Sequence, residues 1–458
     1  MATLINRTLV LVCALWCGAL LTAVPAAAHS GLRAAADEAG ATLSRVSRSL
    51  RGASGAAAPP APKYVYTWAG AKDPSLGGKD SLFVISLEDK EFGKVVGVVP
   101  TPYAGMEPHH CTLSLDRRTL GCGGLFAALA GTPGVLFFNV SGNPRAPTLI
   151  DPATVPQPRF GAFADEFIAT PDGGFLVTLM GSPTGGSPGR IARYDAARKL
   201  VAEYPDPARF ADATTLPGFN PHGMGVSWNH KVALSVDYLE PASTLNGQVV
   251  TKRSTLRLWN TSDWSAIAET IDGSGAEGHI NGPMDAVAIG DTGTFLFGGG
   301  NGYIYYLDGR GAAPHAPKLV WDLLGGAMDR TSYGCILYSF RSGTRLLASA
   351  FVRNMVQLLD TTDPLKPKLL DTLQLPKGAG GHVVRLSADE TTGAVATYFL
   401  DEGSVGQVHF EGDLTVRLFK LNAKATKIIT KKPAKSVVDF KTRMGAQGAF
   451  RPHGVAFY

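Results

Sequence analysis

Charged residues are scarce in this sequence of 458 residues, at 18% of the chain, and the formal net charge is only +5. So small a positive excess argues against a dedicated nucleic-acid-binding protein, and the sequence has no helix-turn-helix, zinc-finger or RNA-binding motif. The 54 glycines and 30 prolines, with so little charge, also disfavour long solvated helices. The composition instead favours short strands joined by many turns.

Long apolar stretches are absent after the first 28 residues, so no later segment is predicted to cross a bilayer. The first 28 residues combine Arg7, an apolar core from Thr8 to Val24, and the small-residue site Ala26-Ala27-Ala28. This pattern is typical of a cleaved secretory signal peptide. We therefore predict a signal peptide over residues 1–28, a secreted or periplasmic location, and no membrane span in the mature chain. Residues 29–62 are rich in Ala, Ser, Arg and Gly, end in prolines, and are predicted to form a flexible tether.

Cysteine is rare as well: the chain has five, and Cys13 and Cys17 belong to the predicted signal peptide. Cys111 and Cys122 flank a turn, so adjacent antiparallel strands could place them opposite each other. Two interpretations remain open for this pair. It forms a disulfide in an oxidising compartment, or it stays as two reduced, buried thiols.

From residue 63 onward the sequence alternates between strand-like runs and turns. The starts of related four-strand units lie roughly 50–70 residues apart, a period of the size found in β-propellers. The Trp-Asp pattern of propellers with forty-residue repeats is missing, which points to a different propeller family. The first unit lacks an inner strand, and the chain ends with an unpaired strand of that type, His453 to Tyr458. We therefore predict an all-β, seven-bladed β-propeller over residues 63–458, closed by pairing of its N- and C-terminal strands.

Histidines recur at the start of the predicted inner strands, which surround the central channel of a propeller. Turn signals precede them in Glu107-Pro108-His109-His110, Asn220-Pro221-His222-Gly223, Gly380-Gly381-His382 and Arg451-Pro452-His453-Gly454. Neutral imidazoles with nearby carboxylates suit copper, iron or zinc, whereas calcium prefers oxygen ligands. The predicted metal ligands are His109, His110, His222, His382 and His453, and the predicted orienting or proton-accepting carboxylates are Asp165, Glu166 and Asp285. The alternative is that these histidines only line a polar channel and form hydrogen bonds to backbone carbonyls. Surface or packing roles are predicted for the other histidines of the domain, His230, His279, His315 and His409.

At these motifs the chain resembles the selenium-binding protein family, which includes methanethiol oxidases. The likeness rests on Glu107-Pro108-His109-His110, on the connection from Val140 to Pro147, on the segment from Asp360 to Pro367, and on the strand with His453. The resemblance implies a seven-bladed propeller and, in the oxidases, copper-dependent conversion of methanethiol to formaldehyde, hydrogen sulfide and hydrogen peroxide.

The chain also departs from the pattern of that family. The Cys-x-x-Cys after the double histidine is missing, and Asp165-Glu166-Phe167-Ile168 replaces a His-Thr-x-His segment. His222 stands where the family tends to carry another residue, so His109, His110 and His453 alone carry over one by one.

Three hypotheses for function follow. The first is an exported, copper-dependent oxidoreductase of the methanethiol oxidase type, acting on a small-molecule thiol. The second is a non-catalytic propeller that binds a ligand or protein. The third is a metal-dependent hydrolase of the lactonase type, which would more naturally use Glu, Asn and Asp around calcium.

Overall fold

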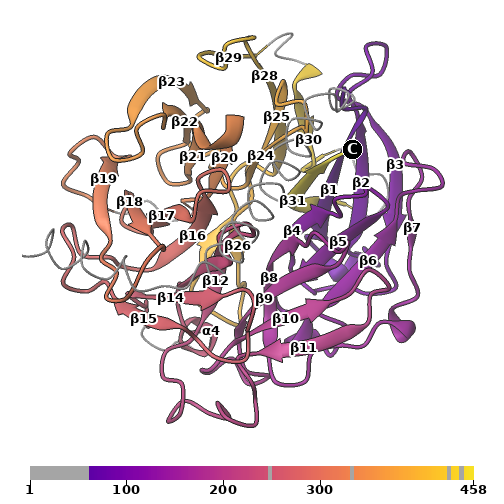
Figure 1. The fold of residues 1–458 in the computed structure, drawn as a ribbon. Coiled ribbons are helices and arrows are strands. Elements are labelled where there is room, and N and C mark those ends of the chain that lie inside the picture. The colour runs from indigo at the N-terminus through magenta and orange to yellow at the C-terminus, as the bar shows by residue number, and fades with distance from the viewer. Residues whose placement is uncertain (1–60, 246–249, 331–334, 431–434, 443–447) are drawn as a thin grey trace, which may run out of the picture. The chain divides into compact units, whose positions relative to one another are not determined.

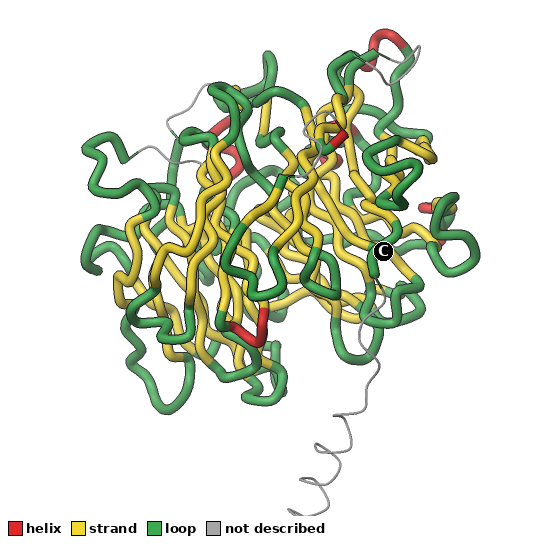
Figure 2. The backbone as a smooth tube through the Cα atoms, turned by 90° about the horizontal axis from the view of Figure 1, so that it is seen from above, coloured by secondary structure: helices red, strands yellow, loops and turns green. Residues whose placement is uncertain are grey.

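The computed structural model describes residues 61–245, 250–330, 335–430, 435–442 and 448–458. The predicted signal peptide, residues 1–28, and all but the last two residues of the predicted tether lie outside these described residues. The described chain is almost entirely strand and loop (Figure 2). Its few helices are one-turn elements: η2 (Pro74–Leu76), α3 (Ala127–Ala130), η3 (Pro152–Thr154), α4 (Pro241–Thr244) and η4 (Arg341–Gly343). No helix in the described ranges is long and apolar enough to cross a membrane.

The strands form seven antiparallel sheets arranged as the blades of a propeller (Figure 1), which confirms the predicted fold class. The first blade is β3 (Val95–Pro100), β2 (Ser81–Ser86), β1 (Tyr64–Ala71) and β31 (Phe450–Phe457). The second is β4 (Pro108–Leu113), β5 (Thr119–Gly124), β6 (Val135–Asn139) and β7 (Thr148–Leu149), and the third is β8 (Ala162–Ala169), β9 (Phe175–Gly181), β10 (Arg190–Tyr194) and β11 (Leu200–Tyr204).

The fourth blade is β12 (Pro221–Ser227), β13 (Val232–Asp237), β14 (Thr255–Asn260) and β15 (Glu269–Asp272). The fifth is β16 (Pro283–Ala288), β17 (Thr294–Gly299), β18 (Tyr303–Asp308) and β19 (Lys318–Asp322), and the sixth is β20 (Leu337–Phe340), β21 (Arg345–Ala350), β22 (Met355–Asp360) and β23 (Lys368–Gln374). The seventh is β24 (Val384–Leu386), β25 (Thr392–Ala396), β28 (Thr415–Leu421) and β29 (Ile428–Ile429), with β30 (Val437–Asp439) also paired to β28.

The last strand closes the ring, as the sequence predicts. β31 pairs antiparallel with β1, so that Val65 lies opposite Phe457 and Ala71 opposite Phe450. Buried side chains of β31 then pack into the apolar layer between the seventh and first blades, where Phe450 stacks edge-on against Phe83 with ring centroids 4.8 Å apart. Similar apolar layers separate the other neighbouring blades, because each sheet alternates its side chains between two faces that are both covered.

Two local features shape the seventh blade. β29 begins at Ile428, because the side chain of Asn422 accepts hydrogen bonds from the backbone N–H groups of Thr426 and Lys427, at 2.7 and 3.1 Å. The chain between β25 and β28 also forms a two-stranded hairpin, β26 (Leu400–Asp401) and β27 (His409–Phe410), that the sequence does not predict.

Cys111 and Cys122 form a disulfide between adjacent strands. They lie opposite each other in the register of β4 and β5, with Cα atoms 4.2 Å apart. The structure thus selects the disulfide over two reduced thiols. Cys335 stays reduced and buried.

Candidate metal centre

A β-bulge interrupts the inner strand of several blades at the same level. The register shifts between Pro108 and Cys111 in β4, between Ala164 and Phe167 in β8, between Pro221 and Met224 in β12, and between Pro283 and Asp285 in β16. A bulge places an extra residue outside the ladder and re-aims its side chain. The residues inside the first three bulges are His109, His110, Asp165, Glu166, His222 and Gly223.

A β-bulge also occurs in β31, the strand that closes the ring, and it contains a histidine. Gly454 pairs with Trp68 and Pro452 with the next residue, Ala69, so His453 is the extra residue between them. The glycine that follows is required, because a Cβ on Gly454 would lie 2.3 Å from the carbonyl oxygen of His109. A Cβ on Gly223 would likewise lie 2.5 Å from the Cα of Asp285. The recurring Pro-His-Gly motif therefore combines a bulge with close approach of the neighbouring inner strand.

The bulges bring four of the predicted histidines together, and His382, just before β24 (Val384–Leu386), joins them. His109 and His453 have ring centroids 3.7 Å apart, and His110 lies 5.0 Å from His109 and 5.2 Å from His453. His222 lies at one end of the cluster, 6.4 Å from His109, and His382 lies at the other end, 4.8 Å from His453. Five imidazoles from four blades thus share one small volume.

Asp165 belongs to the cluster itself and is fully buried. Its Oδ2 atom lies 3.2 Å from Nε2 of His109 and 3.3 Å from Nε2 of His222, while its Oδ1 atom lies 3.4 Å from Nδ1 of His110. Neither carboxylate oxygen makes a hydrogen bond of normal geometry within the described residues, so these contacts are electrostatic. Asp165 therefore occupies the position of a possible ligand, closer to the centre than the orienting role predicted from the sequence.

The imidazoles are buried and short of hydrogen-bond partners. All five histidines are at most 3% exposed, so they lie inside the ring. Among the described residues, both ring nitrogens of His110, His382 and His453 lack a hydrogen-bond partner, as do Nδ1 of His109 and Nδ1 of His222. Buried polar atoms are normally satisfied, so this set of free nitrogens indicates a ligand.

The electrostatics keep these nitrogens able to coordinate. Burial lowers the pKa of His222 to about 4, although Asp165 opposes the shift. Burial also lowers the pKa of His110, His382 and His453 well below the usual value. Burial would raise the pKa of Asp165, but the three nearby imidazoles outweigh it and hold that pKa below its ordinary value. Neutral imidazole and ionised carboxylate are the forms that bind a metal ion.

Two overlapping groups of side chains have ligand atoms close enough to share an ion. One group is His109, Asp165 and His222, and the other is His109, His110 and His453; within each group the atoms lie within 4.8 Å of one another. The nitrogen-rich donor set fits a transition metal such as copper, iron or zinc, and it does not fit the all-oxygen shell of calcium.

Glu166 and Asp285, the other two predicted carboxylates, instead link neighbouring inner strands. Oε2 of Glu166 in β8 accepts a hydrogen bond of 2.8 Å from the backbone N–H of Met224 in β12. Oδ2 of Asp285 in β16 accepts one of 2.7 Å from the N–H of Leu337 in β20. Burial raises the pKa of Asp285 to about 6, and burial together with repulsion from Asp285 raises that of Glu166. Their observed contacts thus support the packing of blades.

A cavity of about 200 Å³ opens onto the group of His109, Asp165 and His222. Most of its wall is apolar, with side chains such as Phe163, Tyr238, Phe399 and Phe410. The hairpin β26–β27 and the segment around α4 supply much of this wall, and Glu402, Gln407 and Lys252 are among its few polar residues. The sequence analysis misses these wall residues, because nothing in their local pattern relates them to histidines in other blades.

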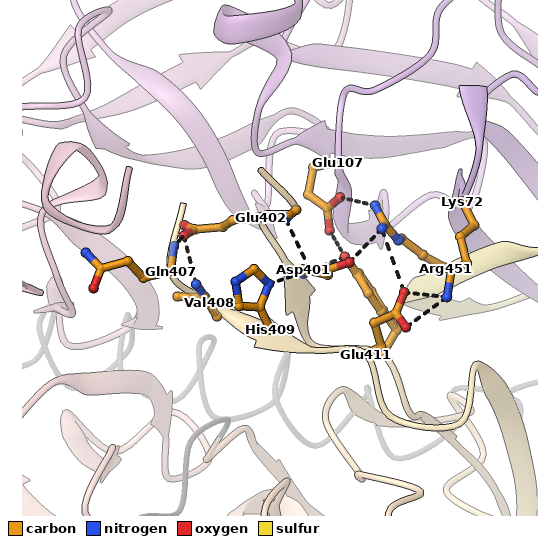
Figure 3. Close-up of polar contacts among 11 residues, drawn as sticks. Lys72, Glu107, Asp401, Glu402, Gln407, Val408, His409, Glu411 and Arg451 are labelled. Atoms are coloured by element: carbon orange, nitrogen blue, oxygen red, sulfur yellow. Dashed lines mark hydrogen bonds and ion pairs between the residues drawn. The ribbon is translucent and has the colours of Figure 1, made fainter. Parts of the chain in front are cut away.

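Polar contacts hold the hairpin β26–β27 in place (Figure 3). Arg451 lies 2.8 Å from Asp401, 3.7 Å from Glu411 and 3.8 Å from the buried Glu107, which also accepts a hydrogen bond from the hydroxyl of Tyr398. On the hairpin, Glu402 accepts hydrogen bonds from the backbone N–H groups of Gln407 and Val408, at 2.6 and 3.0 Å, and from the hydroxyl of Thr244 at 2.5 Å. Because these partners come from several parts of the ring, the cavity wall is fixed by long-range contacts.

The four remaining histidines of the domain lie apart from the centre. Nδ1 of His315 lies 2.5 Å from Glu269, that of His409 lies 2.8 Å from Asp401, and that of His279 lies 2.9 Å from the carbonyl of Ser274. His230 lies beside Ser227 at a distance of 3.4 Å. These contacts agree with the predicted surface or packing roles.

Comparison with known proteins shows the fold and leaves the family open. No family model matches the sequence, and no curated protein is similar to it in sequence. A solved hypothetical selenium-binding protein from Sulfolobus tokodaii superposes with a TM-score of 0.67 at 15% identity, covering 87% of this chain and 94% of the other. A putative 6-phosphogluconolactonase from Bacteroides uniformis and a periplasmic gluconolactonase from Pseudomonas aeruginosa each give a TM-score of 0.57 at 12% identity, covering 87% of this chain and 100% and 99% of theirs. The chain thus has the seven-bladed propeller fold that selenium-binding and gluconolactonase proteins share.

Proposed function

We propose that this protein is a metal-dependent oxidoreductase that acts on a small apolar thiol, with copper as the metal and iron as the alternative, since zinc fits the ligands but has no redox chemistry. The observation that carries the proposal is the buried group of His109, Asp165 and His222 at the floor of an apolar cavity. His109, Asp165 and His222 would hold a transition metal with three protein ligands, the number typical of catalytic sites, and the cavity would give a substrate access to it. The structural likeness to a hypothetical selenium-binding protein is consistent with this assignment.

Different residues of the chain bind the thiol and accept its proton. The apolar wall, including Phe399 and Phe410, takes up the alkyl group of the thiol. Of the two carboxylates that line the cavity, Asp165 and Glu402, Asp165 lies among the histidines, is held ionised by them and accepts the thiol proton. Bound copper supplies the redox chemistry with dioxygen. For methanethiol the balanced reaction consumes one dioxygen and one water and yields formaldehyde, hydrogen sulfide and hydrogen peroxide.

A lactonase is the second candidate, supported by the likeness to two solved lactonase structures. A sugar lactone would need several polar groups around its hydroxyls, whereas few polar side chains line this cavity. The histidine-rich donor set also differs from the oxygen ligands that calcium would need. The site therefore favours the oxidoreductase.

Metal analysis and two activity assays test the proposal on the full-length protein. We expect copper to co-purify with the protein or to bind on loading, and methanethiol to be oxidised with release of hydrogen peroxide. His222→Ala and Asp165→Ala should lose this activity, while the matched control His230→Ala, outside the cluster, should retain it. Copper-loaded protein that hydrolyses a gluconolactone and leaves methanethiol unchanged would favour the lactonase. Absence of metal after loading and of both activities would favour a non-catalytic binding propeller.

We also propose that the protein is exported, to a secreted or periplasmic location. The support is the pattern of residues 1–28 together with the disulfide between Cys111 and Cys122, which suits an oxidising compartment.

A further inference from the structure

We propose that the histidine cluster holds a second metal ion, enclosed behind the ion that faces the cavity. This inference rests on the proposed function for the identity of the first site, His109, Asp165 and His222. The second site is formed by His110, His382 and His453, and His109 stands between the two.

The number of donors supports two ions. Five imidazoles and one carboxylate converge, whereas a protein site for zinc or copper uses three or four such ligands. The group His109, Asp165 and His222 already satisfies the need of one ion that keeps an open position. His110, His382 and His453 would then keep six buried ring nitrogens without hydrogen-bond partners among the described residues. Such a set is costly to bury unless a ligand occupies it.

The positions of the rings separate the two sites in space. His222 and His382 lie at opposite ends of the cluster: the ring of His222 contacts Tyr238 at 5.1 Å, and that of His382 contacts Phe399 at 4.5 Å. His382 lies 4.8 Å from His453 and 6.3 Å from His110, and His110 and His453 already belong to one group of closely spaced ligand atoms. These three rings come from the second, seventh and first blades; the ring of His222 lies 6.0 Å from His110 and, among the described residues, makes no ring contact with His382 or His453.

The residues shared by the two sites lie between them. His109 belongs to both groups of ligand atoms; its Nε2 lies 3.2 Å from Asp165, and its Nδ1 is buried without a hydrogen-bond partner. The carboxylate of Asp165 is placed in the same way, with Oδ2 toward His109 and His222 and Oδ1 toward His110. A carboxylate carries two ligand oxygens, so Asp165 can serve adjacent ions, whereas His109 offers one lone pair as a neutral imidazole and serves both ions only after its ring N–H proton is lost.

The cavity distinguishes the roles of the two ions. Among the described residues that line it are His109, Asp165 and His222, and the rings of His110, His382 and His453 are not among them. The first ion is therefore accessible to substrate, and the second is enclosed by protein.

Copper stoichiometry tests the second site with a readout that does not depend on activity. Full-length protein is stripped with a chelator, loaded with Cu(II) alone, desalted and analysed for metal per chain. We expect about two copper ions in the wild type, about one in His382→Ala and in His222→Ala, and about two in the control His230→Ala. His382→Gln, which keeps most of the side-chain volume, replaces His382→Ala if circular dichroism shows that the alanine variant does not fold.

Azide binding then distinguishes the two positions. Azide should change the Cu(II) absorption spectrum of His382→Ala, whose remaining ion faces the cavity, and leave that of His222→Ala unchanged. One copper per chain in the wild type overturns the second site and leaves the proposed function standing, whereas none overturns both. Two copper ions in folded His382→Ala, or an azide response in His222→Ala, overturns the assignment of ligands.

Discussion

The contribution of β31 to stability can be worked out from one side chain, Phe450. Its ring is 1% exposed and packs edge-on against Phe83, whose own ring packs against Phe440 at 5.0 Å. Truncation of a buried Phe to Ala removes its apolar contacts and leaves a cavity, at a loss of about 3–5 kcal/mol of unfolding free energy. We therefore expect Phe450→Ala to destabilise the whole propeller by that amount, because this layer joins the first and last blades.

The assay is thermal and urea unfolding followed by circular dichroism. A domain of roughly 400 residues has an unfolding entropy of about 0.8 kcal/mol per kelvin, so the loss corresponds to a fall in Tm of about 4–6 °C. The matched control is Phe160→Ala, whose ring is 47% exposed and whose loss should change stability by less than about 0.5 kcal/mol.

Removal of residues 450–458 gives the extreme case. It deletes the buried side chains of Phe450, Val455 and Phe457 together with all strand pairing to β1. The unfolding free energy lost is then comparable to the total stability of a domain, about 5–15 kcal/mol. A truncated chain that melts cooperatively at the wild-type temperature, or a Phe450→Ala variant as stable as Phe160→Ala, would refute closure by β31 as the source of stability.

Three further predictions follow from other parts of the chain. Cys111→Ser with Cys122→Ser opens a cross-link between residues 11 apart and should lower the unfolding free energy by about 3 kcal/mol, as measured in urea; an unchanged midpoint would show that the disulfide does not form. Burial raises the pKa of Asp80 to about 6, above the usual 3.8, although its two oxygens accept hydrogen bonds from Ala71 and Met106. Between about pH 4 and pH 6 the unfolded chain therefore releases this proton while the folded chain keeps it. The unfolding free energy is unaffected by this group below pH 4 and falls by up to about 3 kcal/mol as the pH rises through 6. Asp80→Asn should remove that slope in urea titrations at pH 4 and pH 6, and an equal slope in both proteins would contradict the assignment. Mass spectrometry of protein from the medium or periplasm should find a mature N-terminus at or near His29, whereas Met1 on a soluble cytoplasmic pool would disprove export.

The fold could be predicted because its signals are local and repeated. Alternating strands, turn residues and the period of the units lie in the sequence itself, and the unpaired strand at His453 completes the first unit. The start of the last strands in the seventh blade has no such repeated signal. There the side chain of Asn422 accepts hydrogen bonds from backbone N–H groups that would otherwise pair with a neighbouring strand, and this one side chain decides between a turn and a strand.

The candidate site was predictable in part for the same reason. The Pro-His-Gly motifs mark bulges, and residues at equivalent bulges meet at the axis of a ring. The roles of Asp165 and Glu166 were not separable, because they are neighbours inside one bulge and local backbone geometry alone decides that Asp165 turns to the histidines and Glu166 to Met224. The cavity wall on β26–β27 depends on contacts such as that of Glu402 with Thr244, which span 158 residues and leave no periodic signal.

The position of His453 on the closing strand links assembly of the centre to completion of the ring. In an unfolded chain more than three hundred residues separate His453 from His110, so the effective concentration of one imidazole around the other is low and their joint affinity for an ion is weak. Pairing of β31 with β1 raises that concentration in a single step, because the same strand that seals the first blade carries the imidazole. The metal ion proposed for this centre would bind the closed ring more tightly than the open one, and so would shift the equilibrium toward closure.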